Sequence, residues 1–183
     1  MSEMDDLLAA FRRHVRIPWE TGLAGAQKVW FVIYDPVQER RLRLRLDEFR
    51  QATTQSGHGW HMVDVTDSFG RWMAGQEYRE AYFEEPDYLA DKMPEFATVV
   101  AEEVTTALTA REHDDQTVVA ILGVGALFGL TRVASLMETV APKIRGRLLV
   151  FFPGSYDGST YRLLDARDGW NYLAVPITAS QGA

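Results

Sequence analysis

Apolar residues follow two different spacings along this chain, and the two spacings alternate. Continuous apolar runs rich in β-branched and aromatic residues predict buried strands, and they cover residues 28–34, 60–65, 117–122 and 147–152. Apolar positions at helical spacing predict helices over residues 1–17, 40–46, 69–83, 89–107 and 130–140. This alternation predicts an α/β fold with a doubly wound, mainly parallel sheet that is flanked by helices.

One segment fits both spacings. The run from Arg40 to Leu46 alternates arginine and leucine like a strand, but Leu42, Leu46 and Phe49 also share one helical face. Because the segment lies between two predicted strands, we expect a helix. A strand here would contradict the doubly wound interpretation.

The carboxyl-terminal part is predicted to differ from the rest of the chain. Residues 153–160 are rich in turn formers, and Tyr161–Ile177 predicts a hairpin around Asp168 and Gly169. Pro176 has no backbone N–H to donate, which places the last strand at a sheet edge. We expect residues 1–183 to form a single domain, in which residues 153–183 form a loop and an edge hairpin.

The expected strand order is flavodoxin-like, 2-1-3-4. Ligands of such sheets bind beyond the carboxyl ends of the strands at the switch point, which would lie between the first and third strands. The residues expected at that edge are Asp35, Asp64, Asp67, Gly123–Gly129 and Pro153–Tyr156.

Composition narrows the classes of function. The chain has 183 residues and no cysteine, which excludes disulfides, thiolate metal sites and cysteine nucleophiles. Its net charge of -7 disfavours direct binding of nucleic acid. The longest uncharged apolar run, Val118–Leu130, is shorter than the roughly 20 residues of a membrane span. The acidic start of the chain is unlike a secretory signal, so we expect a soluble cytoplasmic protein without a membrane partner.

A glycine-rich turn follows the third predicted strand and precedes a predicted helix, as a phosphate-binding turn does. With Asp35 it defines a candidate nucleotide site of Asp35, Gly123, Gly125 and Gly129. The spacing is G-x-G-x-x-x-G rather than G-x-G-x-x-G, and no acidic residue ends the following strand. Tight packing is therefore the favoured role of these glycines, and no cofactor is expected.

No catalytic or metal constellation emerges from the residue spacing. His58, His61 and Asp64 are candidate metal ligands, but His61 and Asp64 would point to opposite faces of a strand. The chain also lacks the G-x-x-x-x-G-K-[ST] sequence of P-loop nucleotidases. We expect no metal and no catalytic residue.

Aromatic and arginine residues gather in one stretch, and both types are enriched in the hot spots of protein interfaces. The candidate anchors for a partner are Trp72, Tyr78, Arg79 and Tyr82. The arginine-rich helix supplies a second candidate surface, represented by Arg40 and Arg43.

Several stretches of the chain resemble the BrxB family, a small component of BREX (bacteriophage exclusion) defence systems. They lie at residues 11–15, 18–19, 29–35, 72–79, 122–125, 147–154 and 161–172. The resemblance implies a bacterial phage-defence protein. Its companions would be a PglZ-type protein of the alkaline-phosphatase superfamily, an AAA+ ATPase and a DNA methyltransferase. It implies no catalytic motif to carry over to this sequence.

Two functions of different class remain. The first is a non-enzymatic adaptor that docks a PglZ-type partner within a defence complex. The alternative is a nucleotide-binding regulator that uses the Gly123–Gly129 turn. The absence of a phosphate-binding lysine and of an assembled catalytic site favours the adaptor.

Overall fold

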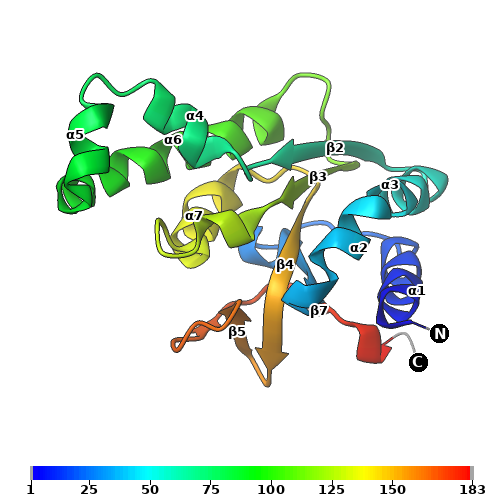
Figure 1. Cartoon of the computed structure of the whole chain (residues 1–183). Coiled ribbons are helices and arrows are strands. Elements are labelled where there is room, and N and C mark those ends of the chain that lie inside the picture. The colour runs from blue at the N-terminus through cyan, green and yellow to red at the C-terminus, as the bar shows by residue number, and fades with distance from the viewer. Residues whose placement is uncertain (1, 182–183) are drawn as a thin grey trace.

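The computed structural model describes residues 2–181, within which seven strands form a mixed sheet with helices on both faces (Figure 1). The helices are α1 (Glu3–Val15), α2 (Glu39–Leu44), α3 (Leu46–Gln55), α4 (Ser68–Ala74), α5 (Arg79–Glu84), α6 (Met93–Thr109) and α7 (Val133–Val140). The strands are β1 (Val29–Tyr34), β2 (Gly59–Asp64), β3 (Thr117–Leu122), β4 (Arg147–Asp157), β5 (Thr160–Leu163), β6 (Trp170–Asn171) and β7 (Val175–Ile177). The four predicted strands and the α/β class are thus confirmed.

The strand order is β2-β3-β4-β1-β7, with all neighbours parallel, so the expected order 2-1-3-4 is wrong. β1 pairs with β4 on one side and with β7 on the other, rather than lying between β2 and β3. The burial of the strands explains this order. Every residue of β1 and β3 is buried, as are the first seven of β4, whereas β2 has only exposed and half-buried residues and takes an edge.

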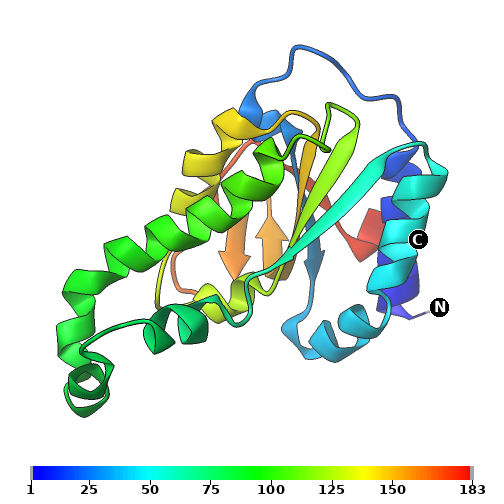
Figure 2. The same cartoon turned by 90° about the horizontal axis from the view of Figure 1, so that it is seen from above.

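Alternate residues of the central strands face two separate hydrophobic layers. On β1, Val29, Phe31 and Ile33 pack in the layer under α6 and α7, whereas Trp30 and Val32 pack in the layer under α1 and α3. Figure 2 shows α6 and α7 on one side of the sheet and α1 and α3 on the other. Successive side chains of a strand point to opposite faces of the sheet, and both faces are covered here, so these strands are apolar throughout.

The arginine-rich segment is helical, as predicted, but it forms two helices. α2 ends and α3 begins on either side of Arg45, whose φ of -115° and ψ of 10° depart from helical values. The helix expected over residues 69–83 is also split, into α4 and α5. Gly75 caps the carboxyl end of α4, and the chain turns through residues 75–78 before α5 begins.

The carboxyl-terminal region differs from the expected edge hairpin. β4 continues through residues 153–157 and pairs with β5 in antiparallel register, so those residues form a strand rather than a turn. Gly154 makes this pairing possible, because a Cβ there would clash with the backbone carbonyl of Arg162. β5 pairs in turn with β6, across a loop that contains Gly169. β5 and β6 form the predicted hairpin around Asp168 and Gly169, and β7, which carries Pro176, lies at a sheet edge as expected.

The ends of the helices follow their sequence signals. Ser2 and Asp5 form a capping box at the start of α1, and Pro94 lies in the first turn of α6, where its missing N–H is not needed. Across residues 2–181, none of the helices has the length and apolarity needed to cross a bilayer.

Candidate functional site

The carboxyl ends of the parallel strands meet at one edge of the sheet, and a cavity of about 400 Å³ lies there. Its walls come from the segments that follow β1, β2 and β3 and from β4 itself, and they include Glu39, Arg43, Thr66, Gly123, Gly125 and Pro153. Of the residues expected at this edge, Gly123, Gly125 and Pro153 line the cavity, whereas Gly129 does not. Asp35, Asp64 and Asp67 are not among the lining residues, although Asp64 contacts two residues that are, Arg43 and Thr66.

A polar network at this cavity pairs the charge of Arg43 with nearby carboxylates. The Arg43 side chain donates to Glu39 at 2.7 Å and to Thr66 at 2.8 Å, and it lies 3.5 Å from a carboxylate oxygen of Asp64. Burial opposes the charge on Asp64, but hydrogen bonds from Thr66 and the nearby Arg43 lower its pKa overall. The buried Tyr34 hydroxyl donates to Glu39, and its pKa is raised by burial first and then by that carboxylate. Since two carboxylates already neutralise Arg43, this edge is poorly prepared for a phosphate.

The first glycine of the turn has a structural role. Gly123 has φ +89°, and a Cβ there would lie 2.8 Å from the backbone nitrogen of Thr66. Gly125 has no positive φ, and its nearest neighbour would be a side-chain atom of Pro153 at 3.3 Å. Gly129 has φ +77° but faces open space. Gly123 is favoured both by its left-handed backbone conformation and by the close approach of Thr66, whereas Gly129 is favoured by its backbone conformation alone.

The turn does not open an α-helix, which differs from the sequence expectation. Gly123 is followed by the 3₁₀ turn Val124–Leu127, and α7 begins only at Val133. The partial positive charge that an α-helix N-terminus offers to a phosphate is therefore missing directly after the glycines. Asp35 is exposed and accepts a hydrogen bond from the backbone N–H of Val37 at 3.0 Å, which caps the turn that begins at Pro36.

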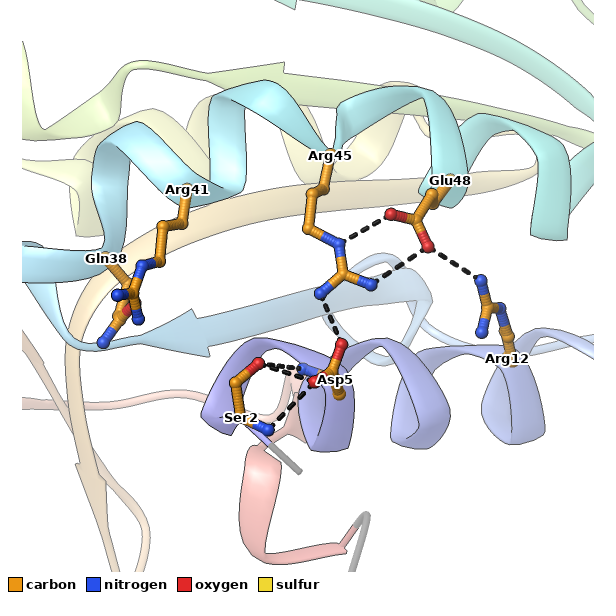
Figure 3. Close-up of polar contacts among 7 residues, drawn as sticks. All are labelled: Ser2, Asp5, Arg12, Gln38, Arg41, Arg45 and Glu48. Carbon is orange, nitrogen blue, oxygen red and sulfur yellow. Dashed lines mark hydrogen bonds and ion pairs between the residues drawn. The ribbon is translucent and has the colours of Figure 1, made fainter.

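The arginine-rich segment does not form one broad basic face, because acidic side chains bind most of it. Arg45 donates to Asp5 of α1 at 2.7 Å and to Glu48 of α3 at 2.6 Å, and Glu48 also binds Arg12 at 3.0 Å (Figure 3). Arg41 contacts only the side chain of Gln38 in this view. Arg40 is exposed, whereas Arg43 is half-buried in the edge cavity.

The histidines considered as metal ligands point to different neighbours. The His58 ring stacks on Trp19 at 3.7 Å between centroids, whereas the His61 ring lies 4.7 Å from that of His113. Within residues 2–181 no three metal-ligating side chains converge.

The aromatic stretch forms a projecting feature, which we call the aromatic lobe and define as residues 75–92. It contains α5 and the 3₁₀ helix Pro86–Lys92, and Figures 1 and 2 show it standing away from the sheet at the far end of α6. Tyr78, Phe83 and Tyr88 are 64%, 66% and 56% exposed there. Exposed aromatic rings belong to the residue types that are enriched in the hot spots of protein interfaces.

Two of the predicted anchors are buried instead. Trp72 is 8% exposed and packs against Phe69 and Phe96, and Tyr82 is 9% exposed in the same hydrophobic layer. Both side chains belong to the hydrophobic core, Trp72 from α4 and Tyr82 from the lobe, so neither offers a face to a partner. Arg79 is exposed, and it donates to the carbonyl of Ala74 at 2.9 Å, at the end of α4.

Sequence reasoning also missed a cluster at the opposite edge of the sheet. Arg147, at the start of β4, is buried, and its guanidinium carbon lies 4.7 Å from the centre of the Trp19 ring. The signal available in the sequence was a lone arginine at the head of an apolar strand.

Comparison with known proteins identifies the family. The family model described as "BREX protein BrxB" matches residues 74–177, which include the aromatic lobe, α6, α7 and the strands from β3 to β7. No curated protein and no solved structure matches the chain. The matched residues cover more than half of the sequence, so the chain belongs to the BrxB family and is a component of a BREX phage-defence system.

Proposed function

We propose that this protein is a non-enzymatic adaptor of a BREX assembly, and that its aromatic lobe docks a PglZ-type partner. The observation that carries the proposal is the exposure of Tyr78, Phe83 and Tyr88 on a projecting segment. The identity of the partner rests on the family resemblance, which also brings an AAA+ ATPase into the same assembly. The assembly is proposed to act in the cytoplasm.

The lobe has the construction of a docking surface. Tyr82 of the lobe is buried in the hydrophobic layer that also contains Phe96 of α6, so the exposed rings are held on a structured support rather than on a free loop. Rigid aromatic rings bury a large area at a low cost in side-chain entropy. Ring positions that are set before binding reduce the ordering cost of association.

The charged residues around the rings indicate which surface chemistry the partner should have. The lobe carries six acidic residues and only two basic ones, Arg79 and Lys92. We therefore expect the partner's surface to combine apolar pockets for the rings with a basic rim. Such complementarity raises the association rate and makes it sensitive to salt.

The alternative function is nucleotide binding at the carboxyl edge, and the edge cavity of about 400 Å³ is the observation in its favour. The compensated charge of Arg43 and the lack of an α-helix start after Gly123 count against it. Binding of ATP, GTP, NAD or a cyclic dinucleotide in a thermal-shift assay would support this alternative.

The adaptor proposal is tested by co-purification. The tagged chain is expressed with its neighbouring operon products, and the proteins retained with it are identified. We expect the PglZ-type protein to be retained by the wild-type chain and lost from Tyr78→Ala/Phe83→Ala. These two positions are chosen because their rings are exposed, whereas Arg79 also supports the end of α4.

The matched control is Phe128→Ala, which removes a ring that is 46% exposed and lies outside the aromatic lobe. This control should retain the partner, and both variants should melt near the wild-type temperature. Loss of the partner from Phe128→Ala but not from the double variant would place the interface elsewhere. Retention of no operon product, combined with turnover of a nucleotide, would reject the adaptor function.

A further inference from the structure

A second cavity lies at the amino-terminal edge of the sheet, away from both surfaces described above. It has a volume of about 300 Å³, and its walls come from the end of α1, the loop that follows, the start of β4 and the segment before β7. Ile17, Leu23 and Leu173 give it an apolar side, and Trp19, Trp30 and Arg147 form another part of its wall. A space of this size is large enough for a small organic molecule.

Arg147 is the unusual group in this wall. Only 5% of the residue is exposed, and its guanidinium donates to just two backbone carbonyls, those of Gly146 at 2.9 Å and Glu20 at 3.1 Å. A guanidinium has five N–H donors, so three have no protein acceptor within residues 2–181. The buried Nε1–H of Trp19, another lining residue, has no acceptor either.

The charge of Arg147 is also unpaired. Across residues 2–181, no carboxylate oxygen lies within 4.0 Å of its guanidinium. The nearest acidic influence is Glu20, which is exposed, while the imidazoles of His14 and His58 lie close enough to Arg147 to feel its charge. Burying a cation without a counter-ion costs free energy of folding. An arginine cannot avoid this cost by losing its proton.

We propose that this cavity binds a small organic anion, whose phosphate or carboxylate oxygens pair with Arg147 and whose apolar body lies against Ile17, Leu23 and Leu173. The planar guanidinium matches both kinds of anion with two parallel hydrogen bonds. The cavity wall has N–H groups without hydrogen-bond acceptors and a positive charge, so it favours a ligand that carries negatively charged oxygen atoms. The apolar side of the cavity selects an anion that is larger than inorganic phosphate.

The experiment titrates the full chain with four probes, which are phenyl phosphate, benzoate, inorganic phosphate and benzyl alcohol. Calorimetry gives the dissociation constant, and fluorescence reports on Trp19 and Trp30 in the cavity wall. We expect phenyl phosphate or benzoate to bind with a dissociation constant of about 1 mM or below. Inorganic phosphate, which lacks the apolar body, and benzyl alcohol, which lacks the charge, should bind more weakly.

Variants at two exposed rim positions, Leu173 and Glu20, locate the binding without disturbing the core, and a variant of the buried Arg147 tests the guanidinium itself. Leu173 is 73% exposed, so Leu173→Glu should weaken the bound probe about fivefold through charge repulsion, whereas Leu173→Gln should not. Glu20→Gln should strengthen binding, because it removes the acidic group nearest to Arg147. Arg147→Lys should weaken it. Arg145→Gln is the matched control, since Arg145 also donates to backbone carbonyls but lies outside the cavity.

Three results would overturn the inference. The first is the absence of heat and fluorescence change with phenyl phosphate and benzoate at about 10 mM, for both the wild type and Glu20→Gln. The second is equal binding of benzyl alcohol and phenyl phosphate. The third is a dissociation constant that is the same in Leu173→Glu and Leu173→Gln.

Discussion

Arg45, at the junction of α2 and α3, forms an ion pair with Asp5 of α1 at 2.7 Å, across forty positions of sequence. The same carboxylate accepts from the backbone N–H of Ser2 at 2.9 Å and thus closes the capping box of α1. Hydrogen bonds from the Ser2 backbone and hydroxyl, and then from Arg45, hold the pKa of Asp5 well below its usual range. One carboxylate therefore both starts α1 and joins it to the neighbouring helices.

This contact predicts that Arg45→Gln lowers the melting temperature more than Arg50→Gln does. Arg45 joins two segments that are far apart in sequence, whereas Arg50 pairs only with Asp47 on its own exposed helix face. An exposed pair within one helix contributes little. Melting of the two variants beside the wild type checks the prediction, and an equal loss in both would contradict it.

The glycines of the turn after β3 should differ in their tolerance of alanine. Gly123→Ala combines a left-handed φ with a clash against the Thr66 backbone, and it should cost more than about 2 kcal/mol. Gly129→Ala, with a positive φ in open space, should cost about 1 kcal/mol, and Gly125→Ala should cost less. Urea unfolding of the three variants measures the order. A larger loss for Gly125→Ala than for Gly123→Ala would refute this explanation.

Stability should fall as the pH decreases from about 7.5 to about 5.5. Burial is the main cause that lowers the pKa values of His14, His58 and His61 below the ordinary value of 6.5, helped at His14 by Arg147. In this interval the unfolded chain therefore binds more protons than the folded chain, and the free energy of unfolding decreases with acidification. The carboxylates with lowered pKa values act in the same direction, but only below about pH 4.

Urea unfolding at the two pH values tests this slope, and His14→Asn should make it shallower. A free energy of unfolding that stays constant, or that rises on acidification, would show that these three imidazoles do not control stability in this interval.

The alternation of strands and helices could be predicted from the sequence, but the neighbours of each strand could not. A run such as Val29–Tyr34 shows that both faces of the strand are buried, without showing which strand lies beside it. One signal was available in β2, where Gly59, His61 and Asp64 are too polar for a central strand and indicate an edge. The apolar run that follows Arg147 in β4 was the matching signal for a central position.

The candidate site was harder to predict, because residue type does not determine exposure. Trp72 and Tyr82 are aromatic residues like Tyr78, yet they are buried in the hydrophobic layer that contains α6, whereas the Tyr78 side chain is exposed to solvent. Local spacing did not indicate that α4 ends at Gly75 and that the chain then turns. The pairing of Arg45 with Asp5 likewise depends on how two distant helices pack.

The acidic character of the aromatic lobe predicts a salt-dependent interface. Because its carboxylates should face a basic rim, the association rate with the PglZ-type partner should fall as salt increases, with a smaller change in the dissociation rate. Surface plasmon resonance at two ionic strengths measures both rates. Glu84→Gln/Glu85→Gln, which removes two exposed charges of the lobe, should reduce the dependence of the association rate on salt. An association rate unaffected by salt would argue against an electrostatic rim.

The dissociation constant between the purified chain and the PglZ-type protein, compared between the wild type and Tyr78→Ala/Phe83→Ala, tests the central claim most directly. Hot-spot residues cost about 2 kcal/mol or more when truncated, so the double variant should bind at least about thirtyfold more weakly. Its melting temperature and its affinity for phenyl phosphate should be unchanged, because both rings are exposed outside the core and outside the second cavity. A dissociation constant equal to that of the wild type would contradict docking through the aromatic lobe.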